Sequence, residues 1–431
     1  LALACHHRIA IDSPKTKIGL PEVTLGLLPG AGGVARLTRL IGLEAAFPFL
    51  LEGKQVKPGV ALKAGLIDDL ALDRDDLMAK AKAWIIANPE STQSWDKKDY
   101  KMPGGNSHHP KVAQMLAIAP AMLKKKTLGN YPAPEAIMNA AVEGALVDID
   151  TALRIETRYL VQVATGKVSK NMINAFWFQM NEITSGASRP NDIPPTDTKK
   201  LGVLGSGMMG HGIAYVSALK GIEVVMTDAT QESADKGLAA IAKIMKKIVD
   251  NGRMAQEKMD TVLGRINATD DYSKLDGCDL IIEAVFEDRE LKAKVTAVTE
   301  SVMDPTGVFG SNTSTLPITG LAERSSRPES FIGIHFFSPV DKMRLVEIIV
   351  GEKTSDDALA KAFDYVLKIH KIPIVVNDSR GFYTSRVFST YPTEGMALLA
   401  EGHSPREIES AGMKAGMPIG PLAVTDEVSL E

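Results

Sequence analysis

The stretch LGVLGSGMMGHGIAYVSALKGIEVVMTD, residues 201–228, decides the fold class of this sequence. It opens with a compact apolar run (201–205), continues with helical periodicity (207–221) and closes with a second apolar run (222–228). This pattern predicts a strand, a helix and a second strand. Further strands are expected at the apolar runs 279–285, 307–314, 331–337, 345–350 and 372–376. Strands separated by helices indicate an α/β domain with a doubly wound, mostly parallel sheet.

A glycine-rich turn lies between the first strand and the helix. Gly205, Gly207 and Gly210 form a GxGxxG pattern, and Asp228 follows 18 residues after the last glycine, at the end of the next strand. In a Rossmann-type fold these glycines permit the tight turn, the approach of a pyrophosphate and close helix packing, while the helix N-terminus attracts the phosphates. Asp228 would bind the adenosine ribose and repel a 2′-phosphate, which favours NAD over NADP. The expected cofactor-binding residues of the turn are Gly205, Gly207, Met208, Met209 and Gly210. A turn that binds nothing, with Asp228 as a strand-end cap, is the structural alternative.

Composition is that of an ordinary globular protein. The 431 residues include 49 Lys and Arg and 53 Asp and Glu, with 45% apolar residues, which disfavours disordered, collagen-like and nucleic-acid-coating proteins. Cys5 and Cys278 stand in no metal-ligand or CxxC spacing, so we expect neither a disulfide framework nor a metal site. No uncharged apolar run reaches the roughly 18 residues that span a bilayer. We expect a soluble protein in a reducing compartment, without a nucleic-acid partner.

A buried acid–base pair is suggested by two of the apolar strands. An enzyme that oxidises an alcohol needs a base, and histidine titrates nearest to neutral pH. Of eight histidines, His335 alone stands inside an apolar strand, FIGIHFF, twelve residues before Glu347 in the apolar strand LVEIIV. In the functional interpretation Glu347 orients the imidazole, and His335 takes the proton. A satisfied core histidine with a strand-edge glutamate is left equally open by the pattern alone. For His211, after the glycine loop, we expect a helix-face role.

Changes in composition divide the chain into four parts. Residues 1–90 have α/β texture, and residues 91–197 hold a polar connector followed by helices. The segment SGASRPNDIPPTDTKK, 185–200, has the composition of a domain boundary. We expect the sheet domain over 198–379 and the start of an all-α domain over 380–431. Helices are expected at 34–43, 75–88, 111–126 and 133–185. The opening run LALACHHRIAI predicts a buried helix or strand, and we expect the chain to be cut at both ends.

Four segments resemble the signature sequences of the (S)-3-hydroxyacyl-CoA dehydrogenase family. They are SNTS at 311–314, HFFSPVDKMRLVEII at 335–349, SRGFYTSR at 379–386 and AGMPIGPLAVTDEVSLE at 415–431. Together with the nucleotide turn they cover roughly residues 198–431. The resemblance implies a catalytic dyad of His335 and Glu347, and a Ser314 hydroxyl that binds the substrate 3-oxygen. It also implies that Glu287 and Lys292 neighbour the nicotinamide end of the cofactor.

Two positions depart from that family. The family usually has Asn where this sequence has Ser338 and Ser385. Serine keeps one donor and one acceptor but loses the reach and the second donor of the amide. We therefore expect these two residues to position the substrate more loosely or through water. A serine at the first place also resembles some multifunctional relatives, so it does not imply inactivation.

The N-terminal segments LALACHHRIA, IGLPEVTLGLLPGAGGVARLTRLIG and KAGLID resemble the crotonase-like enoyl-CoA hydratases and isomerases. The resemblance implies a partial crotonase-like domain, with an oxyanion hole and two carboxylates in the complete enzyme. Glu22 matches the second carboxylate, whereas the first would lie immediately ahead of Leu1. We expect efficient hydration in the intact parent and not in this stretch alone. A turn carboxylate without catalytic role is the alternative for Glu22.

The helical linker YPAPEAIMNAAVEGALVDIDTALRIET, 131–157, completes an order of parts that resembles multifunctional fatty-acid β-oxidation proteins. The resemblance implies hydration of an enoyl-CoA and oxidation of the resulting (S)-3-hydroxyacyl-CoA by NAD. It further implies acyl-CoA thioester substrates and a cytoplasmic bacterial location, with a peroxisome or mitochondrion left open because of the expected truncation. Two competing hypotheses are a related dehydrogenase of sugar acids or short hydroxyacyl-CoAs, and a non-catalytic or weakly active subunit that scaffolds a thiolase.

Overall fold

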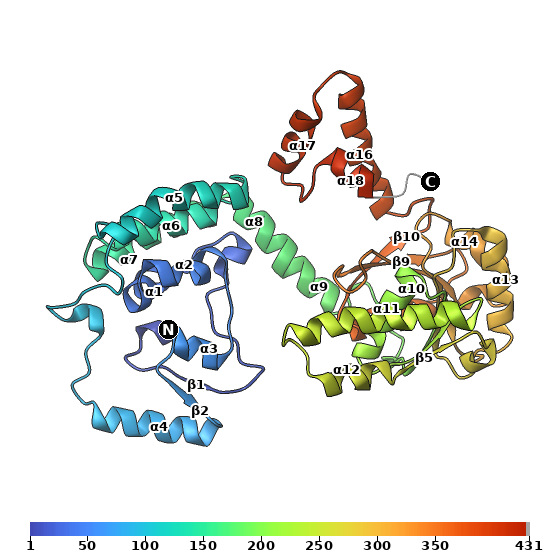
Figure 1. Ribbon diagram of the computed structural model, residues 1–431, viewed down its shortest axis with the longest axis horizontal. Helices are drawn as coiled ribbons and strands as arrows, with labels where there is room; N and C mark the ends of the chain where they lie inside the picture. Colours follow the sequence, from blue (N-terminus) through green and yellow to red (C-terminus); the bar gives the residue numbers. More distant parts are fainter. Residues whose placement is uncertain (428–431) are drawn as a thin grey trace. The chain divides into compact units, whose positions relative to one another are not determined.

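A computed structural model describes residues 1–427 and divides the chain into two compact units, each described by itself below (Figure 1). The sheet unit is Asn181–Ala397. The helical unit is Leu1–Met180 together with the C-terminal segment from Leu398. The last four residues of the signature segment 415–431 lie outside the described residues. The helices α9 (Met180–Thr184) and α16 (Thr384–Ala400) run from one unit into the other.

The sheet unit is built on eight strands in the order β10-β9-β8-β7-β6-β3-β4-β5. Their bounds are Lys200–Leu204 (β3), Glu223–Thr227 (β4), Ile266–Thr269 (β5), Leu280–Glu283 (β6), Val308–Ser311 (β7), Phe331–Phe336 (β8), Leu345–Val350 (β9) and Ile372–Asn377 (β10). All neighbouring strands pair in parallel except β8 and β9, which are antiparallel. The expected doubly wound α/β sheet is confirmed. The strand β5 was not among the expected strands, because its INAT sequence lacks an apolar run.

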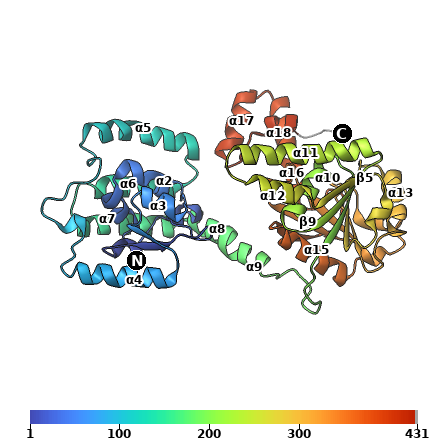
Figure 2. The same ribbon diagram turned by 60° about the horizontal axis from the view of Figure 1, so that its bottom comes forward.

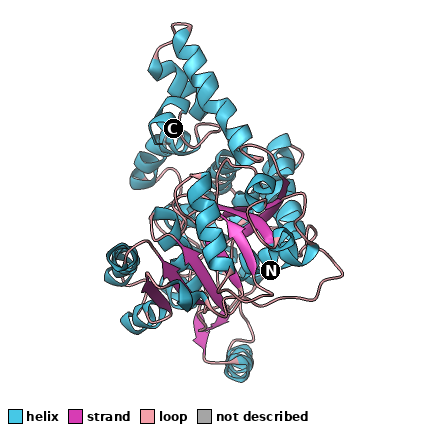
Figure 3. Cartoon of the chain, turned by 90° about the vertical axis from the view of Figure 1, so that its right-hand side faces the viewer, coloured by secondary structure: helices cyan, strands magenta, loops and turns pink. Residues whose placement is uncertain are grey.

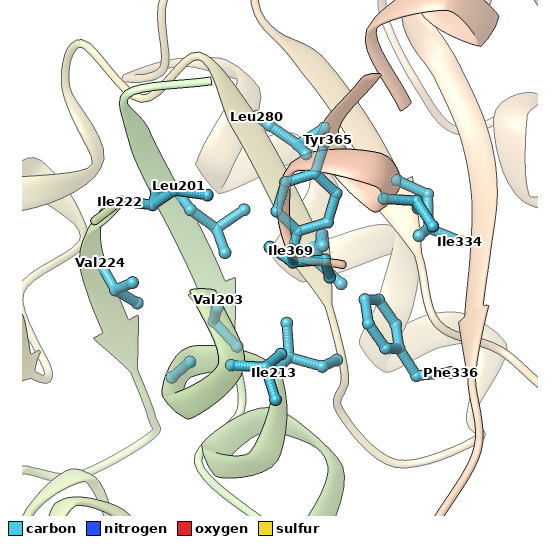
Figure 4. Packing of buried hydrophobic residues seen from close by; sticks show 14 of the residues in the cluster. Leu201, Val203, Ile213, Ile222, Val224, Leu280, Ile334, Phe336, Tyr365 and Ile369 are labelled. Atoms are coloured by element: carbon cyan, nitrogen blue, oxygen red, sulfur yellow. The ribbon is translucent and has the colours of Figure 1, made fainter. Parts of the chain in front are cut away.

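Helices cover both faces of this sheet (Figure 2, Figure 3). Along β3, Leu201 and Val203 join one buried cluster, whereas Leu204 joins another, as the twofold period of a strand requires. Figure 4 shows the first cluster, in which Ile213 and Tyr365 from two helices pack on the strands. Burial on both faces explains why the strands are almost continuously apolar. The helices of the first face are α10 (Met208–Leu219), α11 (Gln231–Asp250), α12 (Gln256–Leu263) and α15 (Asp356–Lys368), and those of the second are α13 (Arg289–Glu300) and α14 (Ile318–Ala322).

The segment before β3 is fixed to α15 by an ion pair. Arg189 donates two hydrogen bonds to the carboxylate of Asp364, at 2.7 and 3.0 Å. The N–H and hydroxyl of Thr196 donate to the same carboxylate at 2.8 and 2.9 Å. Burial raises the pKa of Asp364, but these donors outweigh it and hold that pKa below its ordinary value. Residues 181–197, expected to precede the sheet domain, therefore pack as part of the sheet unit.

The helical unit places helices beside a two-stranded parallel sheet of β1 (Ile9–Ile11) and β2 (Asp69–Ala71). The expected helix at 34–43 is confirmed as α1, and Gly42, with φ +86°, separates it from α2, which was not predicted. The expected burial of the opening run is wrong for η1 (Ala2–Ala4), which contains no buried residue. The helices are α1 (Gly33–Ile41), α2 (Leu43–Leu51), α3 (Pro58–Lys63), α4 (Arg74–Ala87), α5 (Pro110–Thr127), α6 (Pro132–Gly144), α7 (Ile149–Ala164), α8 (Lys167–Ile173), α17 (Pro405–Lys414) and α18 (Pro421–Glu427), with the short turns η2 (Glu22–Leu25), η3 (Ser94–Asp96) and the π-helix η4 (Asn174–Gln179). Within residues 1–427 no helix is long and apolar enough to cross a membrane.

A buried carboxylate joins the linker helices to the PGAGG turn. Glu156 of α7 is 2% exposed, and its two oxygens accept from the N–H groups of Gly32 and Ala35, at 2.5 and 2.9 Å. These N–H groups lie at the start of α1, where helix geometry supplies no partner and where no capping side chain is present at Gly32. Burial raises the pKa of Glu156 above its ordinary value in spite of these bonds.

We expect Glu156→Ala to loosen the start of α1. The substitution leaves two buried donors unpaired, which costs about 1–3 kcal/mol and predicts roughly 10- to 100-fold faster amide exchange in residues 30–37. Hydrogen–deuterium exchange mass spectrometry measures this directly. The matched control is Glu135→Ala, which removes an exposed carboxylate from α6. Equal exchange in both variants would show that Glu156 does not secure the turn.

Candidate active site

Several predicted motifs converge on one edge of the sheet. Because β3, β6, β7 and β8 run parallel, the loops that follow them lie at the same edge. In open α/β sheets this carboxyl edge holds the ligand. Ser314 follows β7, and Ser338 follows β8. Since β9 runs back antiparallel to β8, Glu347 near its start lies at this edge as well.

The glycine turn lines a cavity of about 710 Å³. Gly205 has φ +96°, and a Cβ there would lie 2.7 Å from the Ala284 carbonyl oxygen. A Cβ on Gly210 would lie 1.8 Å from the Gly205 carbonyl oxygen, whereas one on Gly207 would meet nothing within 4 Å. Gly205 and Gly210 are therefore required by packing, whereas Gly207 leaves its backbone uncovered for a ligand. The cavity lining includes Gly205, Ser206, Gly207, Met208, Met209, His211 and Asp228.

The acid at the end of β4 organises the turn. Asp228 Oδ2 accepts from the N–H and the hydroxyl of Ser206 at 2.7 and 2.6 Å, and Oδ1 accepts from the Ala229 N–H at 2.7 Å. Burial raises the pKa of Asp228, but these donors outweigh it and keep that pKa below its ordinary value. A charged carboxylate at this cavity disfavours a 2′-phosphate by repulsion. The cavity lined by the glycine turn and Asp228, called the NAD cradle below, thus fits NAD.

The predicted acid–base pair exists. His335 and Glu347 are directly opposite in the antiparallel β8–β9 pair, with Nδ1 2.8 Å from Oε2. They are 6% and 0% exposed, and the ring of Phe337 lies 4.5 Å from the imidazole. Burial raises the pKa of Glu347, but the donors His335 and Thr384 outweigh it and hold that pKa below its ordinary value. The carboxylate is therefore an acceptor, which places the proton on Nδ1 and leaves Nε2 for a substrate.

The backbone of Ser314 is hydrogen-bonded to a partly buried network of ion pairs. The Ser314 N–H donates to Glu287 Oε1 at 2.9 Å. Lys292 Nζ lies 3.1 Å from Glu287 Oε2 and 2.8 Å from Glu283 Oε1. Burial raises the pKa of Glu287, but Lys292 and the donors around it outweigh burial and keep that pKa below its ordinary value. Glu287 and Lys292 do not line the glycine-turn cavity, so their contact with the nicotinamide stays a prediction.

Glu283 is a site residue that the sequence analysis missed. It is 1% exposed on β6 and accepts from Lys292, from the Ser311 hydroxyl and from the Val285 N–H, each at 2.8 Å. It thereby ties the ends of β6 and β7 to the lysine. An acid within the apolar run DLIIEAV is the same signal that singled out His335, and it could have found this residue.

Three parts of the chain are similar to families of known proteins. Three family descriptions match in chain order: Enoyl-CoA hydratase/isomerase at 1–94, the NAD binding domain of 3-hydroxyacyl-CoA dehydrogenase at 200–379, and its C-terminal domain at 381–431. The solved (S)-3-hydroxybutyryl-CoA dehydrogenase of Ralstonia eutropha is 36% identical, with a TM-score of 0.52 over 54% of this chain and 82% of that one. The chain belongs to the 3-hydroxyacyl-CoA dehydrogenase family. NAD is accordingly the cofactor of the sheet unit.

Curated relatives combine the same parts. The fatty acid oxidation complex subunit alpha of Shewanella halifaxensis is 37% identical over 433 residues, which is 100% of this chain and 60% of that protein. The corresponding protein of Shewanella baltica is 36% identical over 437 residues, 61% of its length. The expected multifunctional resemblance is thereby confirmed. The chain spans about 60% of the length of these relatives.

The two serines that depart from the 3-hydroxyacyl-CoA dehydrogenase pattern lie in different surroundings. Ser338 Oγ is 3.5 Å from Met208 Sδ, so the loop after β8 contacts the glycine turn. Ser385 is the second residue of α16, and its carbonyl accepts from the Ser389 hydroxyl at 2.6 Å. Their role in positioning a substrate stays a prediction.

The loop that carries Ser338 is anchored by Lys371, the residue before β10. Lys371 Nζ donates to the carbonyl oxygens of Val340 and Met343, each at 2.5 Å. The side chain is buried, which lowers the pKa of Lys371. The sequence analysis did not single out this lysine, because its partners belong to a distant loop.

The hydratase-like part holds a second cavity, of about 510 Å³, beside Glu22. Glu22 Oε2 is buried and has no hydrogen-bond partner among the described residues. Leu25 lies on the same turn, and Phe176 and Trp177 of the π-helix η4 contribute the apolar wall. Within residues 1–427, no group of three or more His, Cys, Asp or Glu side chains could hold a metal ion.

We expect Lys371→Met to release the loop over 337–344. The substitution keeps the chain length but leaves two carbonyl oxygens without their donor, so amide exchange in this loop should rise about tenfold or more. Mass-spectrometric exchange on the free protein measures it. Lys342→Met, at an exposed position of the same loop, is the matched control. A loop that stays protected in Lys371→Met would contradict the anchoring role.

Proposed function

We propose that this chain oxidises an (S)-3-hydroxyacyl-CoA to the 3-oxoacyl-CoA with NAD as the oxidant. The observation that carries the proposal is the buried His335–Glu347 pair, 2.8 Å apart, at the same sheet edge as the NAD cradle. A single imidazole held in one tautomer by a carboxylate is suited to removing one hydroxyl proton.

Each residue of the site has its own role in the proposed reaction. His335 takes the proton of the 3-hydroxyl through Nε2, and Glu347 stabilises the resulting imidazolium. Ser314, held by its N–H on Glu287, donates its hydroxyl to the 3-oxygen. NAD, when bound, supplies the acceptor for the hydride that leaves C3. Ser338 and Ser385 complete substrate positioning in this proposal.

Substitution of His335 should slow the oxidation without weakening the binding of NADH. In His335→Gln we expect the oxidation rate of 3-hydroxybutyryl-CoA to fall about 100- to 10,000-fold, while the affinity for NADH stays unchanged. In Asp228→Ala the NADH affinity should fall about tenfold or more, because the turn loses the acceptor of two Ser206 bonds. Absorbance of NADH measures the rate, and NADH fluorescence measures binding.

Three results would contradict the proposal. Undiminished oxidation in His335→Gln would remove the imidazole from the mechanism. Oxidation of a sugar acid in place of the acyl-CoA would favour the competing dehydrogenase. Absence of turnover in the full-length protein with any 3-hydroxyacyl-CoA would favour a non-catalytic subunit.

We further propose that the cavity beside Glu22 takes an enoyl-CoA in the intact protein and that Glu22 handles a proton during hydration. The support is that Glu22 lines this cavity together with Phe176 and Trp177, and that its buried Oε2 has no hydrogen-bond partner among the described residues. An acyl chain fits the wall, and an unpaired carboxylate oxygen is available for water or for the α-proton.

Glu22→Gln should abolish this hydration selectively. In the full-length protein we expect hydration of crotonyl-CoA to fall at least about 100-fold. Oxidation of 3-hydroxybutyryl-CoA should be unchanged, because Glu22 and the dyad belong to different units. Loss of the enoyl thioester absorbance follows the first reaction and NADH absorbance the second. Unimpaired hydration would leave Glu22 as a turn carboxylate.

The relatives are named as one subunit of a complex, which supports a multisubunit assembly for this protein as well. We propose a thiolase as the partner, because thiolysis is the reaction that consumes a 3-oxoacyl-CoA. A cytoplasmic location is proposed with it, in line with the bacterial relatives. Co-sedimentation of the full-length protein with a 3-oxoacyl-CoA thiolase from the same cells tests the assembly, and independent sedimentation would contradict it.

A further inference from the structure

The carboxylate of the dyad has a second, unassigned partner. Glu347 Oε2, the oxygen bound by His335 Nδ1, also accepts from the Thr384 hydroxyl at 2.7 Å. Its other oxygen, Oε1, accepts from the N–H groups of Thr384 and Tyr383, at 2.8 and 3.2 Å. These further hydrogen bonds to the buried carboxylate come from Thr384, the first residue of α16, and from Tyr383, the residue before it.

We propose that Thr384 is a positioning residue of the dehydrogenase, whose hydroxyl fixes Glu347 and limits how strongly the carboxylate holds the proton taken up by His335. The inference rests on the proposed oxidation. A donor on Oε2 withdraws negative charge from the same oxygen that faces the imidazole. The dyad then releases its proton at a lower pH than it would with an unshared carboxylate.

The surroundings contain few other groups that could do this. From β8 the titratable group that faces Glu347 is His335, and from β10 the residue opposite is the apolar Ile374. Tyr383 is exposed and contributes its N–H to the carboxylate. The rings of Phe337 and Phe382 flank the imidazole. The Thr384 hydroxyl contacts the carboxylate directly, at 2.7 Å.

Thr384→Val, which keeps the shape of the side chain and removes the hydroxyl, tests the proposal. We expect the acid limb of the kcat/KM profile for 3-hydroxybutyryl-CoA to move up by about half a pH unit or more. We expect kcat to fall about three- to tenfold, with KM changed less than about twofold. Thr384→Ser should restore the profile, because it keeps the donor. Thr390→Val is the matched control on α16, where the hydroxyl donates to the Val387 carbonyl.

A second measurement does not need turnover. In protein labelled with ¹⁵N-histidine, the ring signals of His335, assigned by their loss in His335→Gln, should change over a higher pH range in Thr384→Val than in Thr384→Ser. A lower unfolding temperature in Thr384→Val without a displaced pH range would show a merely structural threonine and overturn the inference. If the wild type fails to oxidise any 3-hydroxyacyl-CoA, the proposed function fails, and the ring signals alone decide the role of Thr384.

Discussion

The antiparallel pairing of β9 with β8 is the constraint on which the site depends. In a wholly parallel sheet the chain would reach the carboxyl edge only at strand ends. The reversed direction of β9 places Glu347, near the start of β9, directly opposite His335, near the end of β8. The register also sets both side chains on the same face, because opposite residues in a pair point to the same side. A slip of one residue would move Glu347 to the other face and leave the imidazole without a partner.

The two acids buried in the sheet, Glu347 and Glu283, each accept hydrogen bonds from several donors. Glu347 is satisfied by a histidine, a threonine and two N–H groups. Glu283 is satisfied by Lys292, which also holds Glu287 and through it the Ser314 N–H. Unpaired charges in a sheet this apolar would be strongly destabilising. Rigidity at the carboxyl edge is therefore a consequence of pairing, and it keeps the dyad and the serine in fixed positions before any substrate binds.

Most of the fold and of the candidate site can be predicted from the sequence, because the patterns that indicate them lie within short segments. The glycine turn with Asp228 lies within one strand–helix–strand unit, and His335 and Glu347 are conspicuous as ionisable residues in apolar strands. Glu283 carried the same signal. Lys371 and Thr384 could not be found in this way, since their partners come from elements far along the chain and each looks like an ordinary surface residue in its own segment. The strand β5 was not predicted because it is short and polar. The helix α2 was not predicted because it follows α1 after a single residue, Gly42, whose φ of +86° separates the two helices.

Glu347 thus contacts both the catalytic imidazole proposed here and the start of α16. It is paired with His335 of β8, and it also accepts from the N–H and the hydroxyl of Thr384, the first residue of α16. The helix that carries Ser385, the predicted substrate-positioning residue, is consequently hydrogen-bonded to the carboxylate that orients the proposed base, His335. A shift of the helix start by one hydrogen-bond length would change the donors on Oε2. Substrate placement and proton affinity are then not independent properties of this site, because one buried carboxylate serves both.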